Sequence, residues 1–175
     1  KTHDLSARTA SYIGVPVLAT KNYSFISCAG NSNYGSSSKI HIWNENSSDQ
    51  TSTFFQTLDS PSGDNQIAVN TNETLITRLK RNSGSSSWTL YQYESGANSN
   101  FNETRSANVI LEDSISWSQQ RIAEFGGMVY ATDKTKLAYF SPSGSDFSSK
   151  FIDLSSIVPS ATFNVGNLFV SGSSL

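Results

Sequence analysis

Short apolar runs separated by polar turns recur along the whole 175-residue chain, and within many of them apolar and polar residues alternate. Alternation with a period of two predicts β-strands that bury one face. Three long segments each contain four such runs in the same order: two apolar strands around a short turn, an aromatic strand, and a fourth strand after a polar loop. The predicted strands are residues 15–18, 23–28, 39–43 and 53–58; 67–69, 73–78, 88–93 and 107–111; and 122–125, 127–132, 136–140 and 150–154.

A fourth segment begins in the same way, with apolar runs at 163–165 and 167–171, but the aromatic strand and the fourth strand do not follow. We therefore expect a single all-β domain over residues 1–175 that is built from repeats. The repeats are predicted at approximately 14–60, 61–113, 118–157 and 160–175, the last of them incomplete.

Residues 1–13 would form an N-terminal strand segment in front of the first repeat. An incomplete sheet leaves unpaired backbone groups along its edge, and such an edge accepts a further strand. Three alternatives stay open: the segment completes the last repeat of its own chain, it completes that of a neighbouring copy, or the chain belongs to a longer protein.

Equivalent positions in the second strand of each repeat are Phe25, Leu75, Val129 and Phe169, which are 50, 54 and 40 residues apart. Four short strands in a unit of about 40–50 residues are typical of propeller blades. In architecture the chain resembles a β-propeller, although it lacks the Gly-His and Trp-Asp dipeptides of the WD40 type. The resemblance implies a propeller-like stack of four-stranded antiparallel sheets. A β-sandwich or jelly roll is the alternative, because alternating strands with Gly and Ser turns describe those folds too.

The charge of the chain narrows the range of partners. The formal net charge is −2 and only 15% of residues are charged, so we expect no nucleic-acid partner. No apolar stretch approaches the length of a membrane span. Uncharged Ser, Thr and Asn supply most of the polarity, and the single cysteine cannot form a disulfide within the chain. This composition is typical of secreted or cell-surface β proteins, which predicts an extracellular or cell-surface location.

Four N-x-S/T sequons provide candidate glycosylation sites at Asn22, Asn46, Asn72 and Asn102. Apart from glycans at these sites, no cofactor is expected. N-linked glycans are the only added groups that the sequence suggests.

Catalytic and metal-binding signatures are scarce. The two histidines and the single cysteine have no partners at metal-ligand spacing, so no metal site is predicted. There is no G-x-S-x-G elbow, and no catalytic residue is assigned. The candidates that remain are glycosidase-type carboxylates, and nothing in their spacing pairs two of them across a sugar. These carboxylates are Glu124 on an inner strand and Asp59, Asp64, Glu112 and Asp113 near strand ends.

Aromatic side chains are the best candidates for contacts with a ligand or partner. We assign this role to Trp117, which stands outside the repeated pattern, and to Trp43 and Tyr93. The alternative is that the aromatic residues form the core between sheets, because most of them lie in the third strand of a repeat.

Together these features predict a non-enzymatic extracellular module with a structural or adhesive role. It would self-assemble into a homo-oligomer or filament, or attach to a surface, by completing its unfinished last repeat. One alternative is a lectin-like domain that binds extracellular glycans or proteins. A second is a fragment of a larger propeller with glycosidase-like activity.

Overall fold

The computed structural model describes residues 12–29, 39–45, 51–58, 65–82, 87–96, 100–111, 122–133 and 136–154. These residues form twelve β-strands and no helix. Of the predicted N-terminal segment 1–13, residues 1–11 lie outside the described residues and 12–13 belong to the first strand, and the incomplete repeat 160–175 lies wholly outside. The strands are β1 (Tyr12–Ala19), β2 (Tyr23–Ala29), β3 (Lys39–Glu45), β4 (Ser52–Leu58), β5 (Asn65–Val69), β6 (Leu75–Arg81), β7 (Ser87–Ser95), β8 (Phe101–Ile110), β9 (Ile122–Phe125), β10 (Met128–Asp133), β11 (Lys136–Ser143) and β12 (Asp146–Asp153).

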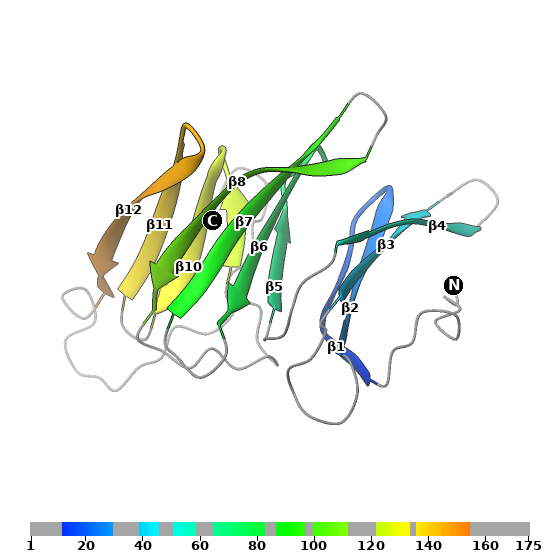
Figure 1. Cartoon of the computed structure of the whole chain (residues 1–175), viewed down its shortest axis with the longest axis horizontal. Helices are drawn as coiled ribbons and strands as arrows, with labels where there is room; N and C mark the ends of the chain where they lie inside the picture. Colours follow the sequence, from blue (N-terminus) through cyan, green and yellow to red (C-terminus); the bar gives the residue numbers. More distant parts are fainter. Residues whose placement is uncertain are drawn as a thin grey trace.

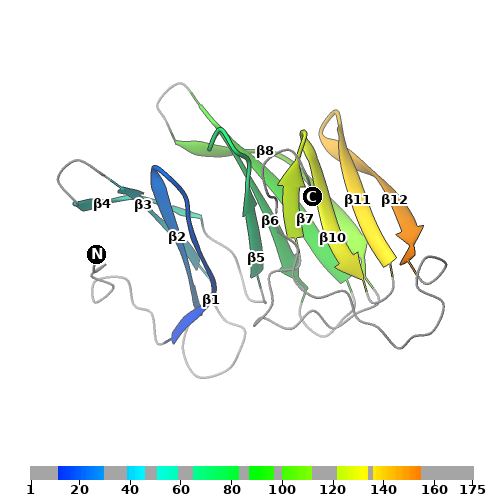
Figure 2. The same cartoon turned by 180° about the vertical axis from the view of Figure 1, so that it is seen from behind.

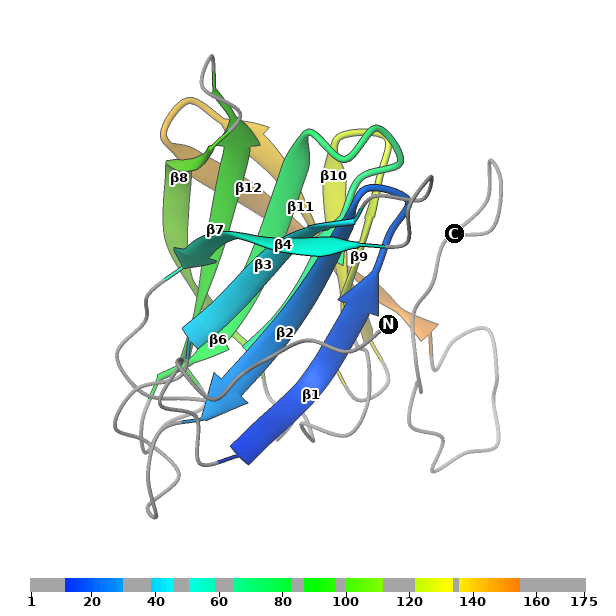
Figure 3. The same ribbon diagram turned by 90° about the vertical axis from the view of Figure 1, so that its right-hand side faces the viewer.

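Consecutive strands form three separate antiparallel sheets of four strands each. We call them the first sheet (β1–β4), the middle sheet (β5–β8) and the third sheet (β9–β12). The sheets stand side by side with the middle sheet between the other two (Figure 1), and the same order is visible from behind (Figure 2). Seen along the stack, the first sheet lies in front of the other two (Figure 3). The predicted all-β class is confirmed, while the described sheets do not close into a ring.

Two apolar clusters hold the three layers together. One lies between the first and middle sheets and contains Phe25, Ile40, Ile42, Leu58, Ile67, Ile76, Tyr93 and Phe101. The other lies between the middle and third sheets and contains Ala68, Leu79, Trp88, Leu90, Val109, Leu111, Ile122, Val129, Ala131, Ala138 and Phe140. The first strands of the sheets lie against one another, β5 between β1 and β9, and β8 also lies against β12.

Strand β7 shows how one strand serves both clusters. Its side chains alternate between the two faces of the middle sheet, as the period of two predicts. Trp88 and Leu90 pack toward the third sheet, whereas Tyr91 and Tyr93 pack toward the first. This division of β7 agrees with the sequence.

Polar side-chain links also join the first and middle sheets, for example at Gln56 and Glu73. The Gln56 side chain bonds the backbone of Phe101 from both ends: Nε2 donates to the Phe101 carbonyl at 2.8 Å, and Oε1 accepts from the Phe101 N–H at 2.9 Å. The Glu73 carboxylate accepts from the Asn22 backbone N–H at 3.1 Å and from the Asn22 side-chain amide. Glu73 has a positive φ of 58°, an uncommon conformation for a residue other than glycine.

Hairpin turns gather at one end of the stack, which we call the turn end (Figure 1). In an antiparallel meander the turns between strands one and two and between strands three and four fall at the same end. Phe125 pairs with Met128 across the two-residue turn Gly126-Gly127, as the sequence predicts. Both glycines have positive φ, 62° and 81°, which matches the two-residue hairpin turns that suit twisted strands.

Two strand boundaries differ from the sequence-based prediction. The segment 141–149 was expected to be a polar loop, but β11 and β12 pair through it and leave only a two-residue turn, with Ser143 opposite Asp146. Similarly, β8 begins at Phe101, six residues before the predicted start. Both segments are polar parts of strands at the edge of a sheet, so they lack the alternation of apolar and polar residues on which the prediction depended.

The proposed equivalence of Phe25, Leu75 and Val129 is wrong by one residue in the third repeat. Phe25 packs toward the middle sheet, the next sheet along the chain. Leu75 shares its face of β6 with Leu79, which packs toward the third sheet and therefore also forward. Val129 packs backward, against the middle sheet. Because a shift of one residue exchanges the two faces of a strand, Met128 or Tyr130 is the structural counterpart of Phe25.

Candidate functional site

Two of the three aromatic residues predicted to contact a ligand are buried. Trp43 is 4% exposed and Tyr93 is 6% exposed. Tyr93 belongs to the cluster between the first and middle sheets, and Trp43 packs edge-to-face with Phe54 at 5.8 Å. Neither ring therefore presents its face to solvent in this arrangement. Trp117 lies outside the described residues.

Three of the four sequon asparagines are exposed. Asn22 and Asn72 lie in the turns that precede β2 and β6, and Asn102 is the second residue of β8. All three lie at the turn end, since β8 begins there next to the loop that follows β7. Asn46 lies outside the described residues. The Asn22 amide donates to Glu73, and the Asn102 amide donates to the Asn100 carbonyl at 3.2 Å.

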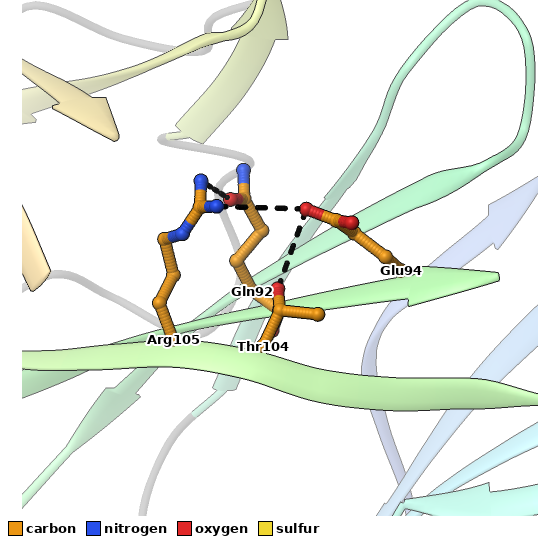
Figure 4. Close-up of polar contacts among 4 residues, drawn as sticks. All are labelled: Gln92, Glu94, Thr104 and Arg105. Carbon is orange, nitrogen blue, oxygen red and sulfur yellow. Dashed lines mark hydrogen bonds and ion pairs between the residues drawn. The ribbon is translucent and has the colours of Figure 1, made fainter. Parts of the chain in front are cut away.

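A cluster of hydrogen-bonding side chains lies at the turn end of the middle sheet. We call Gln92, Glu94, Thr104 and Arg105 the rim cluster (Figure 4). A β-bulge in β8 creates it, because Gln92 pairs with Arg105 and Tyr93 pairs with Glu103, which leaves Thr104 as the extra residue. Bulges of this kind redirect side chains and are common beside functional sites. Here the bulge brings Arg105 onto the same face as Gln92 and Glu94.

The groups of the rim cluster bond to one another. Arg105 Nη1 donates to Gln92 Oε1 at 2.6 Å, and Arg105 Nη2 lies 3.6 Å from Glu94 Oε1. The Thr104 hydroxyl is within donating distance of the Glu94 carboxylate at 3.4 Å and of the Gln92 carbonyl at 3.3 Å. Figure 4 shows the four side chains converging above the strands. The charge of Arg105 is thus balanced locally by Glu94.

Some hydrogen-bonding capacity of this cluster is unused. Gln92 is fully buried, and in the described part of the chain neither its Nε2 amide nor the Arg105 Nε–H has a hydrogen-bond partner. The Arg105 side chain is 18% exposed and that of Glu94 is 48% exposed, so the cluster runs from the interior to solvent. On the third sheet the Phe147 ring faces it, with its centroid 6.0 Å from the Arg105 guanidinium carbon.

A second candidate surface is the face of the third sheet that points away from the middle sheet. Strand alternation places seven apolar and aromatic side chains on this outer face. They are Ala123, Phe125, Met128, Tyr130, Leu137, Tyr139 and Ile152. Ala123 is buried, as is Thr132 on the same face. The rings of Tyr130 and Tyr139 lie 6.2 Å apart, and Ile152 is 43% exposed. None of the described strands packs against this face.

Glu124, the inner-strand carboxylate considered for catalysis, is buried on the face of the third sheet that packs against the middle sheet. Burial raises the pKa of Glu124, and a hydrogen bond from the Gly127 N–H at 2.8 Å partly opposes that rise. The other carboxylates considered, Asp59, Asp64, Glu112 and Asp113, lie outside the described residues. Among the described residues, no group of three or more His, Cys, Asp and Glu side chains could hold a metal ion.

Arg78 is a buried cation of the middle sheet and is 1% exposed. Its guanidinium carbon lies 5.7 Å from the centre of the Tyr91 ring. Burial lowers the pKa of Arg78, and the nearby Tyr93 opposes that change. Burial likewise raises the pKa of Tyr93. Arg78, Tyr91 and Tyr93 pack together on the face of the middle sheet that contacts the first sheet, so we assign them a structural role.

The chain matches no protein-family model and no curated protein sequence. No helix in the described part of the chain is long and apolar enough to cross a membrane. Function therefore has to be argued from the surfaces described above.

Proposed function

We propose that this chain is a non-enzymatic extracellular structural or adhesive module that self-assembles, and that its sheets stack in the manner of propeller blades. The repeated architecture supports this proposal. Three consecutive four-stranded sheets stack face to face, and each of the first two presents a forward face to the next sheet in the chain. Such a stack is modular, because each sheet buries its apolar faces on its neighbours.

The single observation that carries the proposal is the character of the outer face of the third sheet. The last face of a stack that ended in water would be mainly polar. Instead this face carries the paired rings of Tyr130 and Tyr139 beside Leu137 and Ile152. Contiguous apolar patches on a protein surface commonly mark interaction sites. We therefore assign it as the assembly surface.

The proposed occupant is the same face of a second copy, which gives a two-fold dimer. A two-fold contact uses one patch twice and requires that patch to be self-complementary. Lys150 and Asp146 are both exposed on β12 and have opposite charges. A two-fold axis across the face can bring Lys150 of each copy toward Asp146 of its partner. The small net charge of −2 adds little repulsion between copies.

Assembly beyond a dimer would need a second surface. Completion of the last repeat by residues 1–13 of a neighbouring copy remains the proposed route to a filament. A fragment of a larger propeller remains the alternative to self-assembly, because the outer face would then meet the next sheet of the same protein.

The mass in solution tests the proposal directly. Light scattering on a size-exclusion column should give about 38 kDa, twice the 19.0 kDa of one chain, and the dimer should dissociate on dilution. Tyr139→Lys places a charge in the centre of the outer face and should yield monomers. Asn108→Lys adds the same charge at an exposed position of β8 and should leave the dimer intact. A wild-type chain that is monomeric at every concentration contradicts the proposal.

A further inference from the structure

We infer that the rim cluster is a binding site for neutral saccharides, with Glu94, Thr104 and Arg105 as the hydrogen-bonding groups and Phe147 as the apolar contact. This inference is independent of the proposed dimer, because the rim cluster lies between the middle and third sheets and not on the outer face. It also differs from the sites expected from the sequence, which were Trp117, Trp43 and Tyr93.

Local charge argues for a neutral ligand. A simple anion site would present Arg105 without compensation. Here the Glu94 carboxylate lies 3.6 Å from the guanidinium and would repel an anion. An isolated cation would in turn be repelled by Arg105. The cluster therefore suits an uncharged ligand that can both donate and accept hydrogen bonds.

The kinds of group present argue for hydroxyls as the ligand's polar atoms. A carboxylate and a guanidinium are planar groups that engage two neighbouring hydroxyls at once. At the surface the donors are the exposed Thr104 hydroxyl and the partly exposed Arg105 guanidinium. Gln92 Nε2 and Arg105 Nε have no hydrogen-bond partner in the described part of the chain, but both atoms are buried beneath that surface. Glu94, whose side chain is 48% exposed, supplies the acceptor at the surface.

Phe147 supplies the other half of saccharide recognition. Its partly buried ring packs against the apolar cluster between the middle and third sheets, and the Arg105 guanidinium lies over the ring with its central carbon 6.0 Å from the ring centroid. Pyranose rings have apolar C–H faces that pack on aromatic rings, while their hydroxyls point outward to polar groups. The bulge at Thr104 is what brings the polar groups to the same side as this ring.

The sequon residue Asn102 lies next to the site, because it pairs with Glu94 across β7 and β8. A glycan on Asn102 would therefore compete with a saccharide from another molecule. The test accordingly uses unglycosylated chain made in bacteria, so that binding reports only on the added sugar.

The experiment is a screen of the unglycosylated chain against an array of neutral hexose, N-acetylhexosamine and sialylated oligosaccharides, followed by calorimetric titration of the neutral hits. Glu94→Gln and Arg105→Met are the test variants. Methionine keeps much of the stem of arginine and loses its donors. Glu103→Gln is the matched control, since Glu103 is an exposed carboxylate of β8 whose pairing with Tyr93 places it on the opposite face. Thermal unfolding of each variant confirms that it is folded. If Arg105→Met does not fold, Arg105→Lys replaces it as the test variant.

We expect neutral oligosaccharides to bind and both test variants to weaken them about tenfold or more, as the loss of a charged hydrogen-bonding group does. Glu103→Gln should leave the affinity unchanged. The inference is overturned if no neutral sugar binds, if only sialylated sugars bind, or if Glu94→Gln and Arg105→Met bind as well as Glu103→Gln.

Discussion

Phe101→Ala should detach the first sheet from the other two before the rest of the protein unfolds. Phe101 is 2% exposed and lies where the first and middle sheets meet. Its ring contacts Tyr23 at 5.4 Å and Phe55 at 6.2 Å, both in edge-to-face geometry. The two hydrogen bonds from Gln56 go to the Phe101 backbone, so the substitution leaves them in place and removes only side-chain packing.

The expected loss is about 3–5 kcal/mol, the usual cost of truncating a buried phenylalanine to alanine. The two aromatic contacts, at roughly 1 kcal/mol each, are part of that total and not an addition to it. A domain has about 5–15 kcal/mol of stability in all, so the first sheet would open measurably often under native conditions.

Native-state hydrogen exchange measures this opening strand by strand. In Phe101→Ala the amides of β1–β4 should lose protection, while those of β9–β12 keep it. Phe140→Ala is the matched control, because Phe140 is equally buried but belongs to the cluster between the middle and third sheets. In that variant β9–β12 should lose protection first. If both variants lower protection equally in all three sheets, the stack unfolds as one unit and the reasoning is refuted.

Three further predictions concern single positions. Burial alone would raise the pKa of Glu73, but hydrogen bonds from Thr20, Asn22 and Lys21 outweigh burial and lower it. The Glu73 carboxylate therefore stabilises the fold above its unfolded-state pKa, and this contribution is lost as the pH falls through the folded-state pKa. Wild type should lose more stability in acid than Glu73→Gln, and urea midpoints that fall in parallel with pH for the two proteins would disprove this. Gly127→Ala should cost about 1–2 kcal/mol of unfolding free energy, since φ is 81° there and the site is otherwise open, with Gly127→Asn milder; equal urea midpoints for the three proteins would contradict it. Thr132→Val should not lower the melting temperature, because the Thr132 hydroxyl is buried and lacks a hydrogen-bond partner in the described part of the chain; a drop of several degrees would show that the hydroxyl is needed.

The order of the strands could be predicted from the sequence because each repeat has its own apolar alternation. All twelve strands predicted for the first three repeats correspond to strands of the structure, while the runs predicted at 163–165 and 167–171 lie outside the described residues. The errors fall where alternation is missing. Strand β12 is exposed along nearly its whole length. The sequence of its first half consists of Asp, Ser and a single Phe, and such a polar sequence is typical of a loop. Backbone hydrogen bonds with β11 make it a strand, and these bonds do not depend on the polarity of the side chains, so the sequence pattern does not reveal them.

The direction in which each strand faces was harder to predict than its existence. Phe25 and Val129 occupy similar places in their repeats and face opposite ways. Both faces of an inner sheet are apolar, so hydrophobicity alone cannot distinguish the forward face from the backward one. The rim cluster was missed for a related reason. It depends on the bulge at Thr104, and a regular alternation would put Arg105 on the same face as Glu103.

The composition of the middle sheet supports a binding role for the rim cluster. Toward the third sheet this face is otherwise filled by residues such as Trp88 and Leu90, which gain stability by burial. Gln92 interrupts that surface although it is fully buried and leaves its amide nitrogen without a hydrogen-bond partner in the described part of the chain. Such an atom costs about 1–3 kcal/mol relative to an apolar replacement. The amide oxygen has a clear partner, because it accepts a hydrogen bond from Arg105 Nη1 at 2.6 Å and so holds the guanidinium in place. Gln92 therefore positions Arg105 within the rim cluster, at the cost of a buried amide nitrogen, and an apolar residue of the same size would stabilise the stack but leave Arg105 without this partner.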